Sequence, residues 1–262
     1  MRRTILLAVS VCLFIRVGLC QSPITISSDS SDLSRPISTL LDQIRERQGL
    51  PVTYEDPRYS NSADIDDVTT KISHDPSEAE RSGHRTLIPK GKAISFVYAP
   101  TDFNSSQQAE SVVARMLQEY RMLGGPTFRV MRDGVRLHVV PVDVLDAGGN
   151  RARQGSILDT VVSVPGGPRD GGGLLQAICD EVKKQTGYEV GVGPSAPSND
   201  LDGYRTTEGI DHMSARSAIE RVLDKSSRPG SFVWDLYYDP GDKSYGLNFT
   251  YVGPARTPDS LR

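Results

Sequence analysis

The strongest constraint on the fold of this 262-residue chain is a pattern of apolar segments that occurs twice, on either side of Gly148 and Gly149. The first occurrence has a β-type run, an amphipathic stretch and another β-type run, at 23–26, 37–49 and 52–54. The second has the same order, at 157–164, 174–187 and 188–190. A further amphipathic stretch and two alternating segments follow in each. The pattern predicts a helix-and-strand unit present in two copies.

The repeat is also visible in individual residues. In the second amphipathic stretch, matching positions lie at one constant spacing: Ala109, Ser111, Val113, Arg115 and Leu117 correspond to Ala215, Ser217, Ile219, Arg221 and Leu223. In the first stretch, a larger spacing relates Leu40, Leu41 and Ile44 to Leu174, Leu175 and Ile178. Because the spacing is smaller in the second stretch than in the first, the first copy must have extra residues between its two helices. We place them in the polar segment 56–93, where an insertion costs little closure entropy, and we expect this segment to be largely loop.

Residues 1–20 have the features of an export signal. Arg2 and Arg3 precede an apolar run at 5–15, which is shorter than the ~20 residues that usually span a bilayer. We therefore expect a cleaved signal peptide and a periplasmic or secreted protein. Lipid anchoring at Cys20 remains an alternative, although Leu19 stands where a lipoprotein signal usually has a small residue.

Composition argues against several classes of function. Basic and acidic residues, 30 and 33 in number, are interspersed and give a formal net charge of −3, so no nucleic-acid surface is expected. No second apolar run is long enough to cross a membrane. Cys12 and Cys20 lie in the expected signal, and Cys179 then has no cysteine partner for an internal disulfide. We interpret Cys179 as a small hydrophobe on the apolar side of a helix.

The predicted fold class is α+β, with two related halves, each having two helices packed on a small mixed β-sheet that ends in a β-hairpin. Pro36 and Gly49 predict the start and stop of one helix. Ser214 is a candidate N-cap, and Asp133-Gly134 predicts a hairpin turn. The expected boundaries are listed in chain order: first half 21–141, linker 142–155, second half 156–253 and disordered tail 254–262.

The segment 40–57, with the phrase Gly49-Leu-Pro-Val-Thr-Tyr54 at its centre, resembles the short N-terminal domain shared by secretins and TonB-dependent receptors. The second copy is similar through Gly187-Tyr-Glu-Val190 and the helix and hairpin that follow. The resemblance implies a periplasmic domain that binds other envelope proteins. It supplies no catalytic residue to carry over.

Two loops are candidates for ligand sites. The glycine-rich segment 166–173 lies between a strand and a helix, where phosphate-binding loops occur, but it lacks the Lys-Ser/Thr of such a loop. We expect a flexible connector. The segment 198–203 alternates acidic residues as calcium loops do, but Ser198 and Gly209 occupy positions where such a loop needs acids. A solvated loop is expected there.

No residue pattern indicates catalysis, a cofactor or a metal. The four histidines, His74, His84, His138 and His212, have no paired spacing. His138 alternates with apolar neighbours and is expected to point outward. No serine lies in a nucleophile-elbow context. We therefore expect a protein that is not an enzyme.

The last hairpin is unusually aromatic. The strand faces that carry Trp234 and Phe249 are interpreted as core packing, whereas Tyr237, Tyr238 and Tyr245 are candidates for a platform that binds a peptide or glycan. Two functions follow. The first is a non-enzymatic, exported protein–protein interaction module of the bacterial cell envelope. The alternative is an extracytoplasmic ligand-binding protein that uses these tyrosines. Exposed tyrosines favour the alternative, and a bare strand edge favours partner binding by strand addition.

Overall fold

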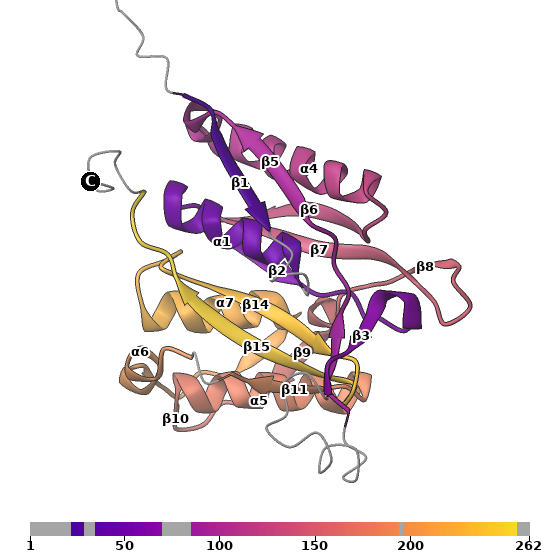
Figure 1. Ribbon diagram of the computed structural model, residues 1–262. Coiled ribbons are helices and arrows are strands. Elements are labelled where there is room, and N and C mark those ends of the chain that lie inside the picture. The colour runs from indigo at the N-terminus through magenta and orange to yellow at the C-terminus, as the bar shows by residue number, and fades with distance from the viewer. Residues whose placement is uncertain (1–21, 29–34, 70–84, 194–195, 256–262) are drawn as a thin grey trace, which may run out of the picture.

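The computed structural model describes residues 22–28, 35–69, 85–193 and 196–255 (Figure 1). The expected signal peptide 1–20 lies outside these residues, as does the expected tail beyond Ala255. Among the described helices, none has the length and apolar character needed to cross a bilayer.

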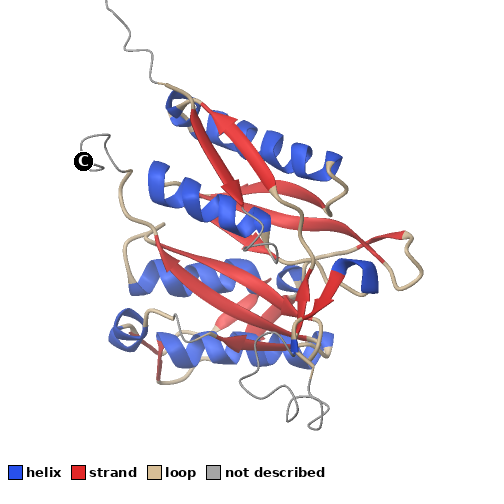
Figure 2. Cartoon of the chain, in the orientation of Figure 1, coloured by secondary structure: helices blue, strands red, loops and turns tan. Residues whose placement is uncertain are grey.

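The chain folds into a mixed arrangement of helices and strands (Figure 2). The elements before Gly155 are β1 (Ile24–Ser28), α1 (Pro36–Gln48), β2 (Val52–Glu55), η1 (Ser62–Asp64), β3 (Ile65–Asp67), β4 (Leu87–Pro89), β5 (Ile94–Tyr98), η2 (Pro100–Phe103), α4 (Ser106–Met122), β6 (Thr127–Asp133), β7 (Arg136–Leu145) and β8 (Arg151–Arg153). Those that follow are η3 (Ile157–Asp159), β9 (Val161–Val164), β10 (Arg169–Asp170), α5 (Gly171–Thr186), β11 (Glu189–Val192), α6 (Ser198–Gly203), β12 (Arg205–Thr206), β13 (Ile210–Ser214), α7 (Ala215–Ser226), β14 (Phe232–Asp239) and β15 (Ser244–Tyr251).

One seven-stranded sheet runs through both halves of the chain. Its strand order is β11-β15-β14-β2-β7-β6, with β8 paired to the end of β7. The hairpins β6–β7 and β14–β15 are antiparallel, whereas β2 lies parallel to β7 and β11 lies parallel to β15. In the middle, β14 of the second half runs parallel to β2 of the first. The separate small sheets expected for the two halves are therefore joined into one.

The same pairings occur in each half. Val52 lies opposite Leu137 where β2 meets β7, and Val190 lies opposite Tyr245 where β11 meets β15. Each half also has a two-stranded antiparallel ribbon, formed by β1 and β5 in the first half and by β9 and β13 in the second. In each ribbon, one strand precedes the first long helix of that half and the other strand precedes the second long helix. The two halves share these pairings, whereas β3–β4, β7–β8 and β10–β12 have no counterpart in the other half among the described residues.

Local signals explain how the helices begin and end. Pro36 occupies the first turn of α1, where its missing N–H leaves no bond unmade. Ser214 caps α7, because its side chain accepts the N–H of Ser217. Gly49 and Gly187 end α1 and α5 in the left-handed conformation, with φ of 60° and 78°.

The two C-caps give an alignment of α1 with α5 that differs from the one proposed from the sequence. They place Arg45 and Lys183 in equivalent positions, because these residues accept the N–H of Gly49 and of Gly187. Leu40 is then equivalent to Ile178, one turn beyond the Leu174 that the sequence match paired with it. The two alignments differ by one turn, and both are compatible with the apolar pattern because a helix face repeats nearly every four residues.

The helices of the two halves cover opposite faces of the central sheet. Leu137 and Val139 of β7 belong to one core, together with residues of α1 and α4. His138, between them, points the other way and lies beside Trp234 of the core that contains α5 and α7. The prediction that His138 points outward was wrong, because both faces of this strand are covered.

Several segments expected as loops carry structure. β7 continues to Leu145 and pairs with β8, so the expected linker 142–155 is largely part of the sheet. Within 56–93, the described residues form η1, β3 and β4. Gly171 begins α5, and the residues expected as a solvated loop at 198–203 form α6.

Because the sheet crosses both halves, we expect them to unfold in one transition. Trp234, the single tryptophan of the chain, is fully buried in the second half, so its fluorescence follows that half. Its thermal transition should coincide with the loss of far-ultraviolet circular dichroism, which follows both halves. Two separated transitions would show that the halves are independent folding units.

Candidate functional site

The structure does not form the tyrosine platform considered from the sequence. Tyr238 and Tyr245 are 6% and 3% exposed and pack against each other, with ring centroids 5.0 Å apart, in the core of the second half. Tyr237 points to the opposite face of the sheet. Its hydroxyl lies 2.7 Å from that of Ser38, and the Arg35 guanidinium lies 4.5 Å from its ring centroid. The three tyrosines therefore form no common surface.

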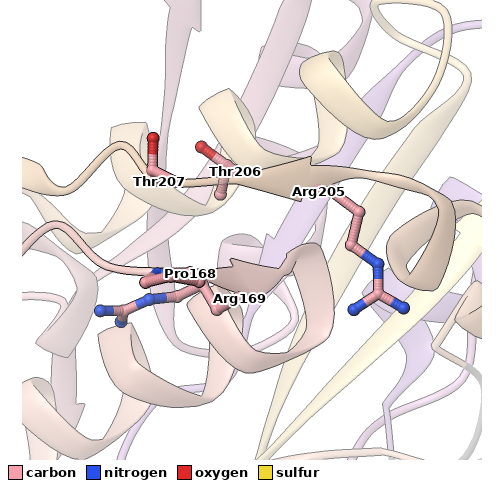
Figure 3. Close-up of a pocket in the computed structure, with 5 residues that line it drawn as sticks. All are labelled: Pro168, Arg169, Arg205, Thr206 and Thr207. Carbon is pink, nitrogen blue, oxygen red and sulfur yellow. The ribbon is translucent and has the colours of Figure 1, made fainter.

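A hollow of about 410 Å³ beside the start of α5 is lined by Pro168, Arg169, Arg205, Thr206 and Thr207. Figure 3 shows the two guanidinium groups pointing away from each other. Arg169 donates to the carbonyl of Pro165 at 2.7 Å, and Arg205 lies 3.3 Å from Asp170. The cap position of α5 is already filled by the Asp170 carboxylate. This hollow lacks convergent groups for an anion.

The most concentrated set of buried polar side chains lies where the halves meet. Arg45 of α1 is 3% exposed, and its two terminal nitrogens lie 2.8 and 2.5 Å from the carboxylate oxygens of Asp235 on β14. Its Nε donates to the carbonyl of Val52 at 2.8 Å. A helix of the first half thus holds a strand of the second.

A second buried ion pair has its arginine in the second half and its carboxylate in the first. Arg216 of α7 lies 2.7 Å from Glu55 of β2, and both residues are buried. The same guanidinium lies 2.5 Å from Asp159. Each half therefore inserts a helix arginine toward a carboxylate on the other half. Such pairs orient the two bodies, because a carboxylate left alone in the interior is costly.

Thr53, His138 and Glu220 form a chain of polar contacts in the same region. The Thr53 hydroxyl lies 2.8 Å from Nδ1 of His138, and Nε2 of His138 lies 3.1 Å from Glu220. Burial, with Arg216 and Arg136 nearby, lowers the pKa of His138 to about 3, and burial raises the pKa of Glu220 to about 7. Nε2 of His138 and Oε1 of Glu220 face each other without a hydrogen bond of good geometry, so the contact is favourable only when one of the two atoms carries a proton.

This chain of contacts is not accessible to a substrate. Thr53 and His138 are both 0% exposed, so a reacting carbonyl has no path to the hydroxyl. We interpret the three residues as structural. They are not recognisable in the sequence because they come from β2, β7 and α7, and no local spacing connects these elements. Among the described residues, no group of three or more candidate ligands is placed to hold a metal.

The junction also satisfies the outer edge of β14. The Leu236 carbonyl accepts the N–H of Asp56 at 2.8 Å, and the Asp56 carboxylate accepts the N–H of Tyr238 at 2.9 Å. Arg35 donates to the Tyr238 carbonyl at 3.0 Å, and Arg136 donates to the Phe232 carbonyl. Backbone and side chains of the first half together cover this edge.

The outer edge of β6 is the topological equivalent of that covered edge, and it is bare in the described structure. Asp133 pairs with Arg136 across a two-residue turn, so hydrogen-bonded positions alternate from there. Phe128, Val130 and Arg132 consequently direct their N–H and C=O groups away from β7. No strand pairs with β6 on that side among the described residues.

A groove runs between this edge and α4. Its volume is about 280 Å³, and its lining comes from one helix face and one strand edge: Ala114, Leu117, Gln118, Arg121, Thr127, Phe128, Arg129 and Val130. Leu117, Phe128 and Val130 supply an apolar floor, whereas Arg121 and Arg129 are exposed. A strand edge next to an apolar groove is suited to adding an extended segment. Both elements are predictable from the sequence, but the strand order, which makes β6 and β11 the two edges of the described sheet, is not.

Comparison with models of protein families, with curated proteins and with solved structures found no match to the chain.

The buried pair between Arg45 and Asp235 should be sensitive to removal of one partner. Arg45→Leu leaves Asp235 unpaired and should lower the free energy of unfolding by about 3–5 kcal/mol, measured by urea denaturation. The double variant Arg45→Leu with Asp235→Leu should recover part of this loss. Arg85→Leu is the control, because it removes a pair between side chains that are 66% and 37% exposed, and solvent-exposed pairs contribute little to stability. Equal losses in R45L and R85L would contradict the role given to the junction.

Glu220 should make stability depend on pH. Its raised pKa means that the folded protein keeps a proton that the unfolded chain releases above about pH 4.5, so stability falls as pH rises from about 4.5 to 7. His138, with a lowered pKa, has the opposite effect between about 6.5 and 3. Glu220→Gln removes the first effect alone. The stability of this variant relative to the parent should therefore rise from pH 4.5 to 7, by up to about 3 kcal/mol. A pH-independent difference between Glu220→Gln and the parent would contradict the assignment.

Proposed function

We propose that this protein is a non-enzymatic interaction module of the bacterial cell envelope that binds a partner by adding a strand to β6. The supporting observation is the pairing of a bare strand edge with an apolar groove beneath α4. Edges of this kind are usually covered or blocked, since unpaired N–H and C=O groups recruit other chains. An edge that stays open beside a groove is therefore a candidate binding surface.

The internal junction supports this mode of binding. In the same chain, the equivalent edge of β14 is filled by β2, which runs parallel to it with Asp235 opposite Tyr54 and Leu236 opposite Glu55. The fold therefore already joins its halves by strand addition. We propose that the shared pairings of the two halves come from duplication of one unit, in agreement with the repeat in the sequence.

The cell-envelope setting is the second part of the proposal. It depends on the export features of residues 1–20 and on the resemblance of 40–57 to the short domain of secretins and TonB-dependent receptors. The alternative, ligand binding through the aromatic hairpin, is less favoured because Tyr238 and Tyr245 are buried.

Site-specific photocrosslinking in a bacterial host tests the proposal. A benzophenone amino acid replaces Arg132, which is exposed on the β6 edge, or Lys184 on α5 as the control. Figure 1 places α5 at the other end of the molecule from β6. The full chain should reach the periplasmic fraction, and only position 132 should give a discrete adduct with an envelope protein. Adducts of equal yield at both positions, or none at 132, would count against strand addition at β6.

A further inference from the structure

We propose that the β6 edge accepts an acidic extended segment of a different protein, parallel to β6, and does not accept a second copy of this chain. The inference rests on the proposed function and specifies its partner. It comes from comparing, position by position, the bare edge of β6 with the filled edge of β14.

The equivalence of the two edges is fixed by their geometry. The buried positions of α4 and α7 match at the constant spacing found in the sequence, from Ala109 with Ala215 to Leu117 with Leu223. The same spacing makes Asp133 equivalent to Asp239, and these are the last residues of β6 and β14. The same spacing makes Val130, whose backbone N–H and C=O point away from β7, equivalent to Leu236. At the junction, the Leu236 carbonyl accepts the N–H of Asp56, the residue after β2.

In the filled site, acidic residues of the second half receive basic residues of the first. Asp235 binds Arg45, and Asp224 of α7 lies 2.5 Å from Arg136. Glu220 lies beside His138. Apart from Arg216, which binds Glu55 of the incoming strand, the charged groups that receive the strand are acidic, and they face basic and imidazole groups of the first half.

In the bare site the charge is reversed. Arg129 replaces Asp235, Gln118 replaces Asp224 and Ala114 replaces Glu220. Arg121, exposed in the last turn of α4, replaces Ser227. A change of opposite sign, Glu110 for Arg216, is neutralised by Arg132, which lies 2.8 Å from Glu110. Arg129 makes an exposed contact of 3.4 Å with Asp159, and an exposed pair of that length gives little stability.

The positive charge beside β6 favours a partner of negative charge. A segment placed on β6 as β2 is placed on β14 meets the side chains of Arg129 and Arg121, so acidic residues on or beside it are complementary. The internal precedent sets the direction, because β2 runs parallel to β14. Alternate side chains of the segment would then face the apolar floor at Leu117, Phe128 and Val130.

The same comparison disfavours a second copy. The strand equivalent to β2 is β11, and the residue equivalent to Arg45 is Lys183, as the helix C-caps show. A second chain that offered β11 to β6 would therefore bring Lys183 toward Arg129. Gly193 would stand where Glu55 meets Arg216 in the junction. Like charges and lost ion pairs both weaken such a contact.

A phage-displayed library of random ten-residue peptides is the probe. The library is selected on the full chain and counter-selected on the Val130→Pro variant. This substitution removes a backbone N–H that points away from β7 and is not used in the β6–β7 pairing. Val130→Thr keeps that N–H and is the matched control. Enriched peptides should be net acidic, with β-branched residues at alternate positions. Their affinity for the double variant Arg121→Glu with Arg129→Glu should fall about tenfold or more.

Lys184→Glu with Arg205→Glu makes the same change of net charge at exposed sites of the second half and should leave binding unchanged. Enrichment of basic or uncharged peptides, or equal binding to both double variants, would overturn the acidic partner. So would the failure of every selected peptide to distinguish the parent from V130P. A dimer in sedimentation equilibrium that V130P abolishes would identify a second copy as the occupant. If position 132 crosslinks a basic segment in cells, the interaction module stands and this inference fails.

Discussion

The parallel contact between β14 and β2 is the interaction on which the rest of the structure depends. The backbone register is short, with Asp235 opposite Tyr54 and Leu236 opposite Glu55. Side chains therefore set the geometry: Arg45 binds Asp235 from one sheet face, and Arg216 binds Glu55 from the other. Buried pairs of this kind give limited net stability, but a misaligned junction leaves charges unpaired in the interior. The junction thus fixes the relative position of the halves and leaves β6 as an edge.

The sequence predicted features whose physical cause is local. Gly49 ends α1 because it reaches a left-handed conformation, and Ser214 caps α7 because its hydroxyl reaches an N–H of the next turn. Asp133-Gly134 formed the expected hairpin turn. The apolar positions from Ala109 to Tyr120 form the buried face of α4, whereas Leu123 lies beyond the helix and is exposed. The mixed α/β class followed from these elements.

The sequence did not predict the features that depend on distant contacts. The pairing of β14 with β2 joins segments that are far apart in the sequence, and no turn or residue spacing predicts it. His138 was misplaced because strand alternation tells inside from outside only when one face is solvated. Tyr238 and Tyr245 are buried because they pack in one core with residues of α5 and α7, and the sequence of the hairpin alone does not show this covering. The edge status of β6 likewise depends on the strand order of the whole sheet.

The arginines beside β6 answer a problem that any bare edge creates. An apolar edge with free N–H and C=O groups pairs readily with copies of itself, and charged side chains on the edge are a common means of preventing this. Arg129 and Arg132 are exposed on β6, and Lys183 is the residue that a second copy would bring toward Arg129. The charges that keep copies of the chain apart are therefore the same charges that make the groove complementary to an acidic segment. Replacing Arg129 with an acidic residue would weaken both the repulsion of a second copy and the attraction of an acidic segment, because the same positive charge is responsible for both.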